Sequence, residues 1–222
     1  MEEHTVKIIS TDDLTHDVKR YRVEKPSGYT FVPGQATDLS INTHQLKNKK
    51  RPFTFTGLNS DPYLEFIIKI YPSHNGVTKE LDSLKPGDEL IVRDVWGAIT
   101  YRGTGVFIAG GAGITPFISI FRDLQSRDEL EGNMLIFANK TEADIIQPDE
   151  FRNMLGDNFI NILSEEKLSN YHHGMINEEF LRSTVGDFNR QFYLCGPPPM
   201  MNALKKQLAN LGIEKESLTV EF

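Results

Sequence analysis

The stretch FIAGGAGITPF, Phe107–Phe117, joins an apolar run, a glycine turn and the start of a helix. The run from Val106 to Ala109 has the length and composition of a buried parallel strand. Thr115-Pro116 then opens a pattern with apolar residues on one helical face. Such a turn presents backbone N–H groups and the positive end of a helix dipole, which favour an anion such as a diphosphate. The alternative is a tight turn that binds nothing.

The composition limits the classes of protein to which the chain can belong. Its 222 residues and 39% hydrophobic content suit one large domain or two small ones. The net charge of −7 argues against nucleic acid as a partner. No apolar run approaches the roughly 20 residues that span a bilayer, and the acidic start, MEEHTVKII, is unlike a secretory signal. We therefore expect no membrane association.

Cys195 is the only cysteine in the sequence. A single cysteine excludes an intramolecular disulfide and suits a reducing compartment, so we expect a cytoplasmic protein. One thiolate is also too few for an iron–sulfur cluster, which normally has about four. We predict no metal site.

The first half of the chain has the pattern of antiparallel β structure. Short runs with partial two-residue alternation are separated by turn signals such as Pro33-Gly34 and Pro86-Gly87. One short helical pattern lies at Thr78–Leu84, and Thr78 is its predicted N-cap. Six strands at this spacing predict a small closed barrel. These strands are Thr5–Ser10, Lys19–Glu24, Ala36–Ile41, Phe53–Gly57, Tyr63–Tyr71 and Glu89–Val95.

After about Arg102 the pattern changes, and apolar strands alternate with helices, which implies a doubly wound parallel sheet. The expected strands are Val106–Ala109, Met134–Ala138, Phe159–Leu163, Phe192–Cys195 and Leu218–Phe222. The expected helices run from Thr115 to about Leu130, over Pro148–Leu155, from about Asn177, and up to Leu211. We predict two domains: a six-stranded antiparallel barrel in residues 1–102 and an α/β domain with a five-stranded parallel sheet in residues 103–222.

Arg51-Pro52-Phe53-Thr54 combines side chains that suit a phosphorylated aromatic ligand. Arginine can bond a phosphate through two N–H groups. Phe53, on the same strand face as Arg51, offers a flat surface for a ring. The hydroxyl of Thr54 can bond a heteroaromatic nitrogen. The alternative is an edge strand with an exposed arginine.

The segment His74–Thr78 precedes the short helical pattern. Gly76 permits close approach to the backbone, and Thr78 at a helix start brings the positive end of a dipole toward a diphosphate. An ordinary capped loop is the alternative.

The segment Tyr193–Met200 again joins an apolar strand to a helix. It places the thiol of Cys195 at the carboxyl end of a strand, where open α/β sheets bind ligands. The turn Gly196-Pro197 follows directly. The alternative is a small cysteine buried in the core.

In this order and spacing, the motifs resemble those of the ferredoxin–NADP reductase family, whose members join a flavin-binding barrel to a nicotinamide-binding domain. The glycine turn departs from the GxGxxG of ordinary dehydrogenases and is similar to the family's GGxGIT/SP motif. The other similar segments are Arg51–Thr54 (the RxYS/T flavin motif), Gly76–Thr78 (the flavin-phosphate motif), Cys195–Pro198 (CGPP) and Glu221-Phe222 (the acidic-then-aromatic end).

The resemblance implies an enzyme that moves a hydride from NADH or NADPH to bound FAD and passes electrons on singly. It implies Thr54, Cys195 and Glu221 as the catalytic side chains, with Thr54 and Cys195 also in contact with cofactor. The other implied cofactor contacts are Arg51, Pro52, Phe53, Ile68, Lys69, Ile70, Gly76, Val77, Thr78, Gly110, Gly111, Gly113, Ile114, Thr115, Pro116, Lys140, Gly196, Pro197 and Phe222.

The sequence departs from the family pattern at two places. Phe53 replaces the commoner tyrosine, which removes a hydroxyl and keeps a stacking surface. Asp94–Ala98 stands where many members have a GPxG-like turn. In the family the terminal aromatic stacks on the flavin, so the resemblance implies the same for Phe222.

The resemblance implies an electron acceptor that is a separate molecule. Lys47, Lys49 and Lys50 form a cationic run that could dock an acidic ferredoxin or flavodoxin, or could only solubilise a loop. Lys140 could meet the 2′-phosphate of NADPH or remain solvated, so the choice between NADH and NADPH stays open. Two other functions also stay open: a flavin or dye reductase with a small-molecule acceptor, and a non-catalytic flavin-binding subunit. We expect a monomer.

Overall fold

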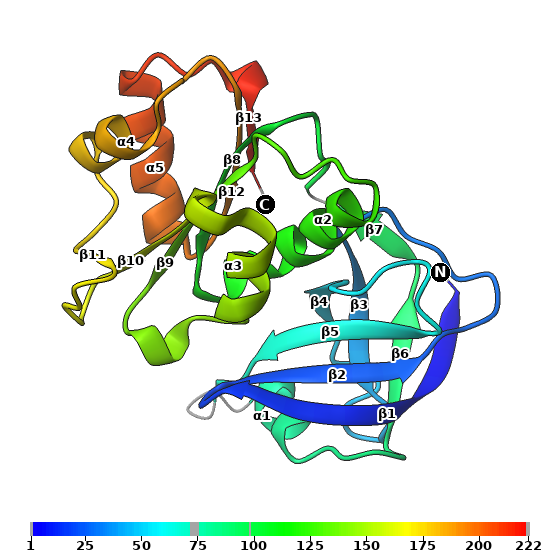
Figure 1. Ribbon diagram of the computed structural model, residues 1–222. Coiled ribbons are helices and arrows are strands. Elements are labelled where there is room, and N and C mark those ends of the chain that lie inside the picture. Colours follow the sequence, from blue (N-terminus) through cyan, green and yellow to red (C-terminus); the bar gives the residue numbers. More distant parts are fainter. Residues whose placement is uncertain (1, 72–75, 98, 221–222) are drawn as a thin grey trace. The chain divides into compact units, whose positions relative to one another are not determined.

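The computed structural model describes residues 2–71, 76–97 and 99–220. They form two compact units, which are drawn together in Figure 1. The first unit combines the chain up to Thr100 with Thr115–Asp123, and the second combines Tyr101–Ile114 with the chain from Leu124. Residues 115–123 therefore pack with the first unit although they follow the start of the second in the sequence.

The first unit is an antiparallel barrel in which neighbouring strands follow the order β4-β3-β6-β1-β2-β5. The segment after β4 reaches the other end of this path, where the Thr56 N–H donates to the Glu65 carbonyl at 2.9 Å. The predicted six-stranded barrel is confirmed, and the short strand β7 pairs with β3 in addition. The bounds are β1 (Glu3–Thr15), β2 (Val18–Glu24), β3 (Gln35–Ile41), β4 (Arg51–Thr54), β5 (Tyr63–Lys69), β6 (Glu89–Arg93) and β7 (Val95–Gly97).

The helix α1 (Val77–Asp82) corrects one sequence prediction. Its N-cap is Gly76, and Thr78 lies within the first turn, so the prediction that Thr78 caps the helix is wrong. Val77 is 1% exposed and belongs to the barrel core. Because burying this apolar side chain stabilises the first turn, the helix begins one residue before Thr78.

The second unit is a parallel sheet in the order β11-β10-β9-β8-β12-β13. The chain runs outward from β8 to β11 and then returns to β12 on the other side of β8, so the order reverses between β8 and β12. The predicted five-stranded sheet is confirmed, with β11 as an additional, two-residue edge strand. The bounds are β8 (Gly105–Gly110), β9 (Met134–Asn139), β10 (Phe159–Leu163), β11 (His172–His173), β12 (Gln191–Cys195) and β13 (Leu218–Val220).

The helices of the chain cover the sheet and the barrel as amphipathic elements. In the second unit α4 and α5 pack Leu181, Leu204 and Leu208 against Val106 and Ile108 on one face of the sheet (Figure 1). The helix bounds are α2 (Thr115–Ser126), α3 (Pro148–Leu155), α4 (Glu178–Thr184) and α5 (Pro198–Asn210). Short 3₁₀ turns are η1 (Gly111–Ile114), η2 (Glu142–Asp144), η3 (Gly156–Asn158) and η4 (Lys215–Ser217).

The helix α2 ends earlier than the sequence predicts. It stops at Ser126 instead of about Leu130, because the backbone turns at Arg127 and Asp128 takes a positive φ of 57°. A left-handed residue cannot continue a right-handed helix.

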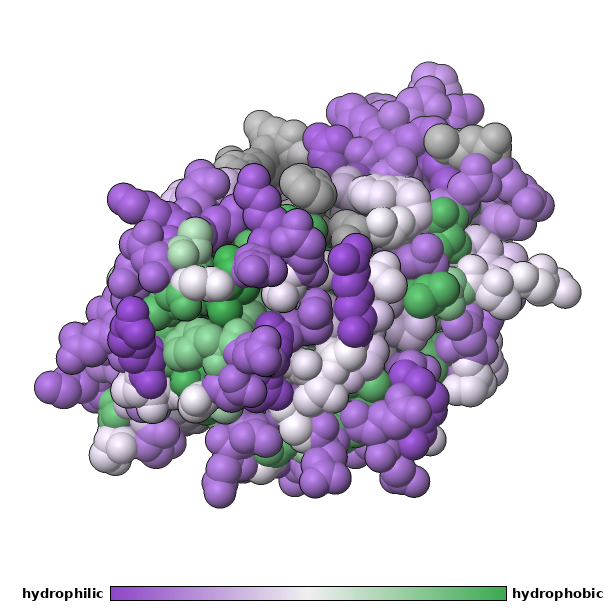
Figure 2. Space-filling model, turned by 90° about the horizontal axis from the view of Figure 1, so that it is seen from above, coloured by the Kyte–Doolittle hydropathy of each residue, from purple (hydrophilic) through white to green (hydrophobic). Residues whose placement is uncertain are grey.

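The exposed face in Figure 2 is mostly hydrophilic, with small apolar areas between polar side chains. Among the described residues, no helix combines the length and apolar character needed to cross a membrane.

Candidate functional site

β4 carries the first flavin motif at one end of the barrel path. Arg51 and Pro52 are exposed, Phe53 is half-buried against the barrel core, and Thr54 is buried. The Arg51 guanidinium donates to the Lys50 carbonyl at 2.8 Å. An exposed guanidinium carries five N–H donors in a fixed plane, so this side chain fits a phosphate.

Arg93, which the sequence analysis missed, fixes the loop that leads into β4. Its side chain is 2% exposed. The guanidinium donates to Glu3 Oε1 at 2.7 Å, to the Asp38 carbonyl at 3.3 Å and to the Lys47 carbonyl at 3.1 Å. The hydrogen bond from Arg93 lowers the pKa of the Glu3 carboxyl. The signal in the sequence was a charged residue inside the apolar alternation of Glu89–Val95.

Gly76, Val77 and Thr78 form the start of α1. A Cβ built on Gly76 has no atom of the described residues within 4 Å, so a ligand has room to approach this backbone. Val77 faces the core, which leaves its backbone N–H as its contribution to a phosphate site. His74 and Asn75, also part of the predicted motif, lie outside the described residues.

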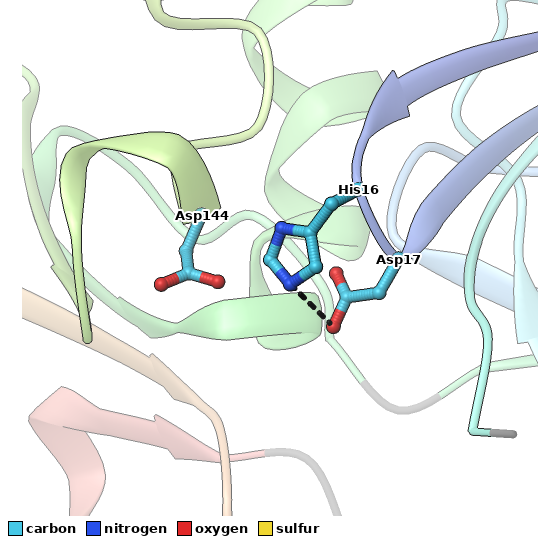
Figure 3. Close-up of side chains that lie close together, drawn as sticks. All are labelled: His16, Asp17 and Asp144. Carbon is cyan, nitrogen blue, oxygen red and sulfur yellow. Dashed lines mark ion pairs between the residues drawn. The ribbon is translucent and has the colours of Figure 1, made fainter.

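Ile68, Lys69 and Ile70 have side chains engaged within the barrel. Ile68 and Ile70 are core residues, 1% and 4% exposed. The Lys69 ammonium pairs with the Asp17 carboxylate at 2.7 Å, and the His16 ring lies 3.6 Å from the same carboxylate (Figure 3). Any contact from these three positions to a flavin would therefore come from backbone groups.

The glycine turn of the second unit packs against the turn after β12. A Cβ on Gly113 would overlap the Cys195 carbonyl oxygen and lie 2.7 Å from the Gly196 nitrogen. A Cβ on Gly110 would overlap the Met200 sulfur. Close packing of two turns thus requires glycine at 110 and 113, a reason that the sequence alone could not supply.

Gly111 has a different role in the turn. Its φ is +52°, and a Cβ built on it has no atom of the described residues within 4 Å. The turn therefore leaves open space beside a backbone that needs glycine. η1 and α2 follow directly, with a proline in the first turn of α2 and the Ile114 side chain in the core. Open space at a glycine turn before a helix fits the diphosphate of a dinucleotide.

Cys195 ends β12 beside Ala109 of β8, at the carboxyl edge where the strand order reverses. Its side chain is 5% exposed. Gly196 follows, and Pro197 is the N-cap residue of α5. The predicted CGPP segment and the predicted glycine turn thus meet at the switch point, where open α/β sheets bind nucleotides.

Lys140, directly after β9, is paired with an acidic side chain. Its ammonium lies 2.8 Å from Glu165, which follows β10, and this hydrogen bond raises the pKa of Lys140. Two more carboxylates lie close by: Glu166 accepts the Glu142 N–H at 2.7 Å, and Glu142 accepts the Tyr171 hydroxyl at 2.9 Å. The end of β9 and β10 is therefore acidic.

Glu221 and Phe222 lie outside the described residues, so their predicted contacts with nicotinamide and flavin stay predictions.

Comparison with known proteins supports the same two halves. A family model for an oxidoreductase FAD-binding domain matches residues 5–101, and one for an oxidoreductase NAD-binding domain matches residues 107–206. NADH-cytochrome b5 reductase 1 of Aspergillus terreus is 33% identical, across 91% of this chain and 76% of that protein. The propane 2-monooxygenase reductase component of Rhodococcus jostii is 27% identical, and the match spans 61% of its length.

Solved structures agree in fold. A ferredoxin NADP+ reductase from Neisseria gonorrhoeae, with bound FAD and NADP, superposes with a TM-score of 0.87 at 17% identity, over 100% of this chain and 98% of that one. The resemblance of the motifs is thereby confirmed at the level of the family. The chain belongs to the ferredoxin–NADP reductase family and is a flavoprotein oxidoreductase that uses FAD and a nicotinamide nucleotide.

Proposed function

We propose that this enzyme takes a hydride from NADH and passes electrons singly to a separate, acidic carrier of the ferredoxin or flavodoxin type. The observation that supports an acidic acceptor is the cationic run before β4, in which Lys47 and Lys49 are exposed and Lys50 is half-buried. Local potential steers an encounter even where the net charge is −7. The names of the relatives, a cytochrome b5 reductase and a monooxygenase reductase component, support a protein acceptor.

In the proposed site the chain binds and orients two cofactors. Arg51 and the backbone at Gly76–Thr78 hold the flavin phosphates, and Phe53 and Thr54 hold the flavin ring. The glycine turn and Cys195 hold the nicotinamide nucleotide. FAD supplies the conversion from a two-electron donor to one-electron transfer, which amino-acid side chains do poorly.

The preference for NADH is supported by the acidic surroundings of Lys140. NADPH differs from NADH by a 2′-phosphate on the adenosine ribose, which the family resemblance places near the end of β9. There Glu165 already neutralises Lys140, and Glu142 and Glu166 add negative charge. A further dianion is therefore repelled. The names of several relatives also begin with NADH.

Glu165→Gln should shift this preference toward NADPH. Removing the carboxylate frees the Lys140 ammonium and lowers the local negative charge, so the ratio of kcat/KM for NADPH to that for NADH should rise about tenfold. The measurement is steady-state reduction of a neutral quinone with each nucleotide. Glu178→Gln, the same change on α4 where Glu178 accepts from Asn210, is the control and should leave the ratio unchanged. An unchanged ratio in Glu165→Gln would remove the electrostatic argument for NADH.

Lys47→Glu together with Lys49→Glu should slow reduction of an acidic carrier about tenfold or more at low salt, because the steering potential is reversed. Lys50 is left in place because it lies 3.8 Å from Glu3, beside the Arg93 contact. The measurement is stopped-flow reduction of acidic ferredoxins and flavodoxins by NADH and the holoenzyme. The difference should shrink near 0.1 M salt, where charges are screened beyond about 10 Å.

The matched control is Lys206→Glu with Lys215→Glu, which makes the same change in net charge on exposed positions of the second unit. A neutral quinone should be reduced at equal rates by the wild type and by both double variants. If the acidic carriers are not reduced and the quinone is, the small-molecule reductase is the correct function. A flavin that NADH does not bleach without air would point to a non-catalytic subunit.

A further inference from the structure

The nicotinamide motif is divided between the two compact units. Gly110–Ile114 belongs to the second unit, whereas Thr115 and Pro116 belong to the first, together with the rest of α2 up to Asp123. The first nine residues of α2 are therefore packed as part of the flavin barrel. Hydrogen bonds between α2 and barrel residues, all within the first unit, account for this packing.

A buried carboxylate joins α2 to two strands of the barrel. Glu65 of β5 is 2% exposed. Its Oε1 accepts from Arg122 of α2 at 2.6 Å and from the Thr56 hydroxyl at 3.1 Å, and its Oε2 accepts from Arg22 of β2 at 3.0 Å. Arg122 also donates to the Thr56 carbonyl at 2.7 Å. Burial raises the pKa of the Glu65 carboxyl, but the two guanidinium groups outweigh it, so the net shift is downward and Glu65 is charged.

A second tie brings the backbone of α2 close to the barrel. The Ser119 hydroxyl accepts the Gly34 N–H at 3.1 Å and donates to the Pro116 carbonyl at 3.3 Å. A Cβ on Gly34, where φ is +93°, would overlap the Ile99 carbonyl oxygen and lie 3.2 Å from Ile120 Cδ1. Ser119 thus links a barrel turn directly to a residue of the nicotinamide motif.

The main effect of these contacts is to fix the orientation of α2 on the barrel. A buried ion pair often stabilises a fold no more than apolar residues of the same volume, but it restricts the geometry of the groups that it joins. The bonds of Arg122 to the Glu65 carboxylate and to the Thr56 carbonyl fix where the helix lies on the barrel. A helix held in this way keeps the N–H groups of its first turn in one place.

We propose that Arg122 is a positioning residue for the nicotinamide nucleotide: through Glu65 it anchors α2 on the flavin barrel and so holds Thr115-Pro116 in the orientation that binds the cofactor. The inference rests on the proposed binding of NADH at the glycine motif. Arg22 of β2, which bonds the other oxygen of the same carboxylate, stabilises the barrel without this role.

Arg122→Met should weaken binding of NAD+ to the oxidised holoenzyme roughly 5- to 150-fold, the usual range for coupling between sites. It should raise KM for NADH more than it lowers kcat and leave flavin content unchanged. Titration of NAD+ followed by the flavin absorption measures the affinity, and a melting curve measures stability. Arg122→Lys keeps the charge and should recover much of the affinity.

Arg22→Met is the matched control, because it also deprives Glu65 of one guanidinium. Both methionine variants should melt at lower temperature, but Arg22→Met should keep the affinity for NAD+ within about twofold of the wild type. Ser119→Ala, a milder change at the second tie, should also weaken the binding of NAD+. It provides the test if Arg122→Met does not fold.

Two results would overturn the inference. One is an unchanged affinity for NAD+ in Arg122→Met and Ser119→Ala, which would leave Arg122 a stabilising residue only. The other is an equal loss of affinity in Arg22→Met, which would indicate general loosening of the barrel. A wild-type holoenzyme that neither binds NAD+ nor is bleached by NADH would end the proposed function instead, so the two failures are distinguishable.

Discussion

Gly113→Ala is expected to abolish nicotinamide-dependent activity while the protein still binds flavin. The new Cβ would overlap the Cys195 carbonyl oxygen and lie 2.7 Å from the Gly196 nitrogen, and both are backbone atoms that no rotamer change can move aside. The two turns at the switch point must therefore separate. Overpacking of this kind costs about 1–3 kcal/mol and sometimes more, and a displacement near 1 Å can lower the rate of a positioned reaction about 10²-fold.

Two other glycines of the turn provide a graded comparison. A Cβ on Gly110 meets mainly the Met200 side chain, which is flexible and can move, so Gly110→Ala should have a smaller effect. Gly111→Ala meets open space but adds strain at a φ of +52°, a cost of about 1–2 kcal/mol. Anaerobic bleaching of the flavin by NADH in a single turnover gives the rates, and flavin content gives the state of the barrel.

The order of damage should therefore be Gly113→Ala first, with Gly110→Ala and Gly111→Ala both milder. If Gly113→Ala transfers the hydride as fast as the wild type, close packing against the turn after β12 is not the reason that position 113 needs glycine. Loss of flavin from Gly113→Ala would show instead that the damage reaches the barrel.

Local patterns were sufficient to predict the barrel, the parallel sheet and the position of the motifs. The run of glycines before Thr115-Pro116, for example, reads as a turn before a helix, and the structure has η1 and α2 there. The reason for two of those glycines was not predictable. Gly110 and Gly113 lie against Cys195–Met200, further along the chain, and such pairings have no local signature.

Other errors arose at element ends, where sequence patterns are weakest. Thr78 is a good capping residue by type, but with Val77 buried the helix begins at Val77 and its N-cap is Gly76. β11 has only His172-His173, too short for any periodicity. β7 follows Asp94 so closely that it merges with β6 in the sequence pattern.

The buried charges were the largest omission. Glu65 and Arg122 are separated by 57 residues, and Arg93 and Glu3 by 90. A charged residue within an apolar alternation can face solvent or pair inside, and only tertiary contacts decide which. Glu65 and Arg93 are both buried, but Glu65 bonds Arg122 and Arg22 whereas Arg93 bonds the exposed Glu3.

Arg93→Met is expected to destabilise the barrel strongly and to release its flavin. The register of β3 with β7 ends at Thr37 and its register with β6 begins at Ser40, so the ladder changes partner between them. The Arg93 guanidinium lies at this change and donates to the carbonyl of Asp38 at 3.3 Å. Its third contact, at 3.1 Å, holds the Lys47 carbonyl and with it the loop before Arg51.

Methionine fills a similar volume but donates no hydrogen bond, so the Asp38 carbonyl loses a donor and the loop loses its anchor. Loss of the hydrogen bonds to the Asp38 and Lys47 carbonyls costs about 1–3 kcal/mol, and Arg51 should then no longer be held where it can bind a phosphate. Thermal unfolding and flavin content of the purified protein measure the two effects.

Arg20→Met is the control, because the pair of Arg20 with Asp12 at 3.0 Å is partly exposed and should contribute less than about 1 kcal/mol. Arg93→Lys keeps the charge but cannot bond all the acceptors of the guanidinium, so its stability should fall between the wild type and Arg93→Met. If Arg93→Met keeps its full flavin content and unfolds at the same temperature as Arg20→Met, the loop before β4 is held by its own turns and Arg93 is dispensable.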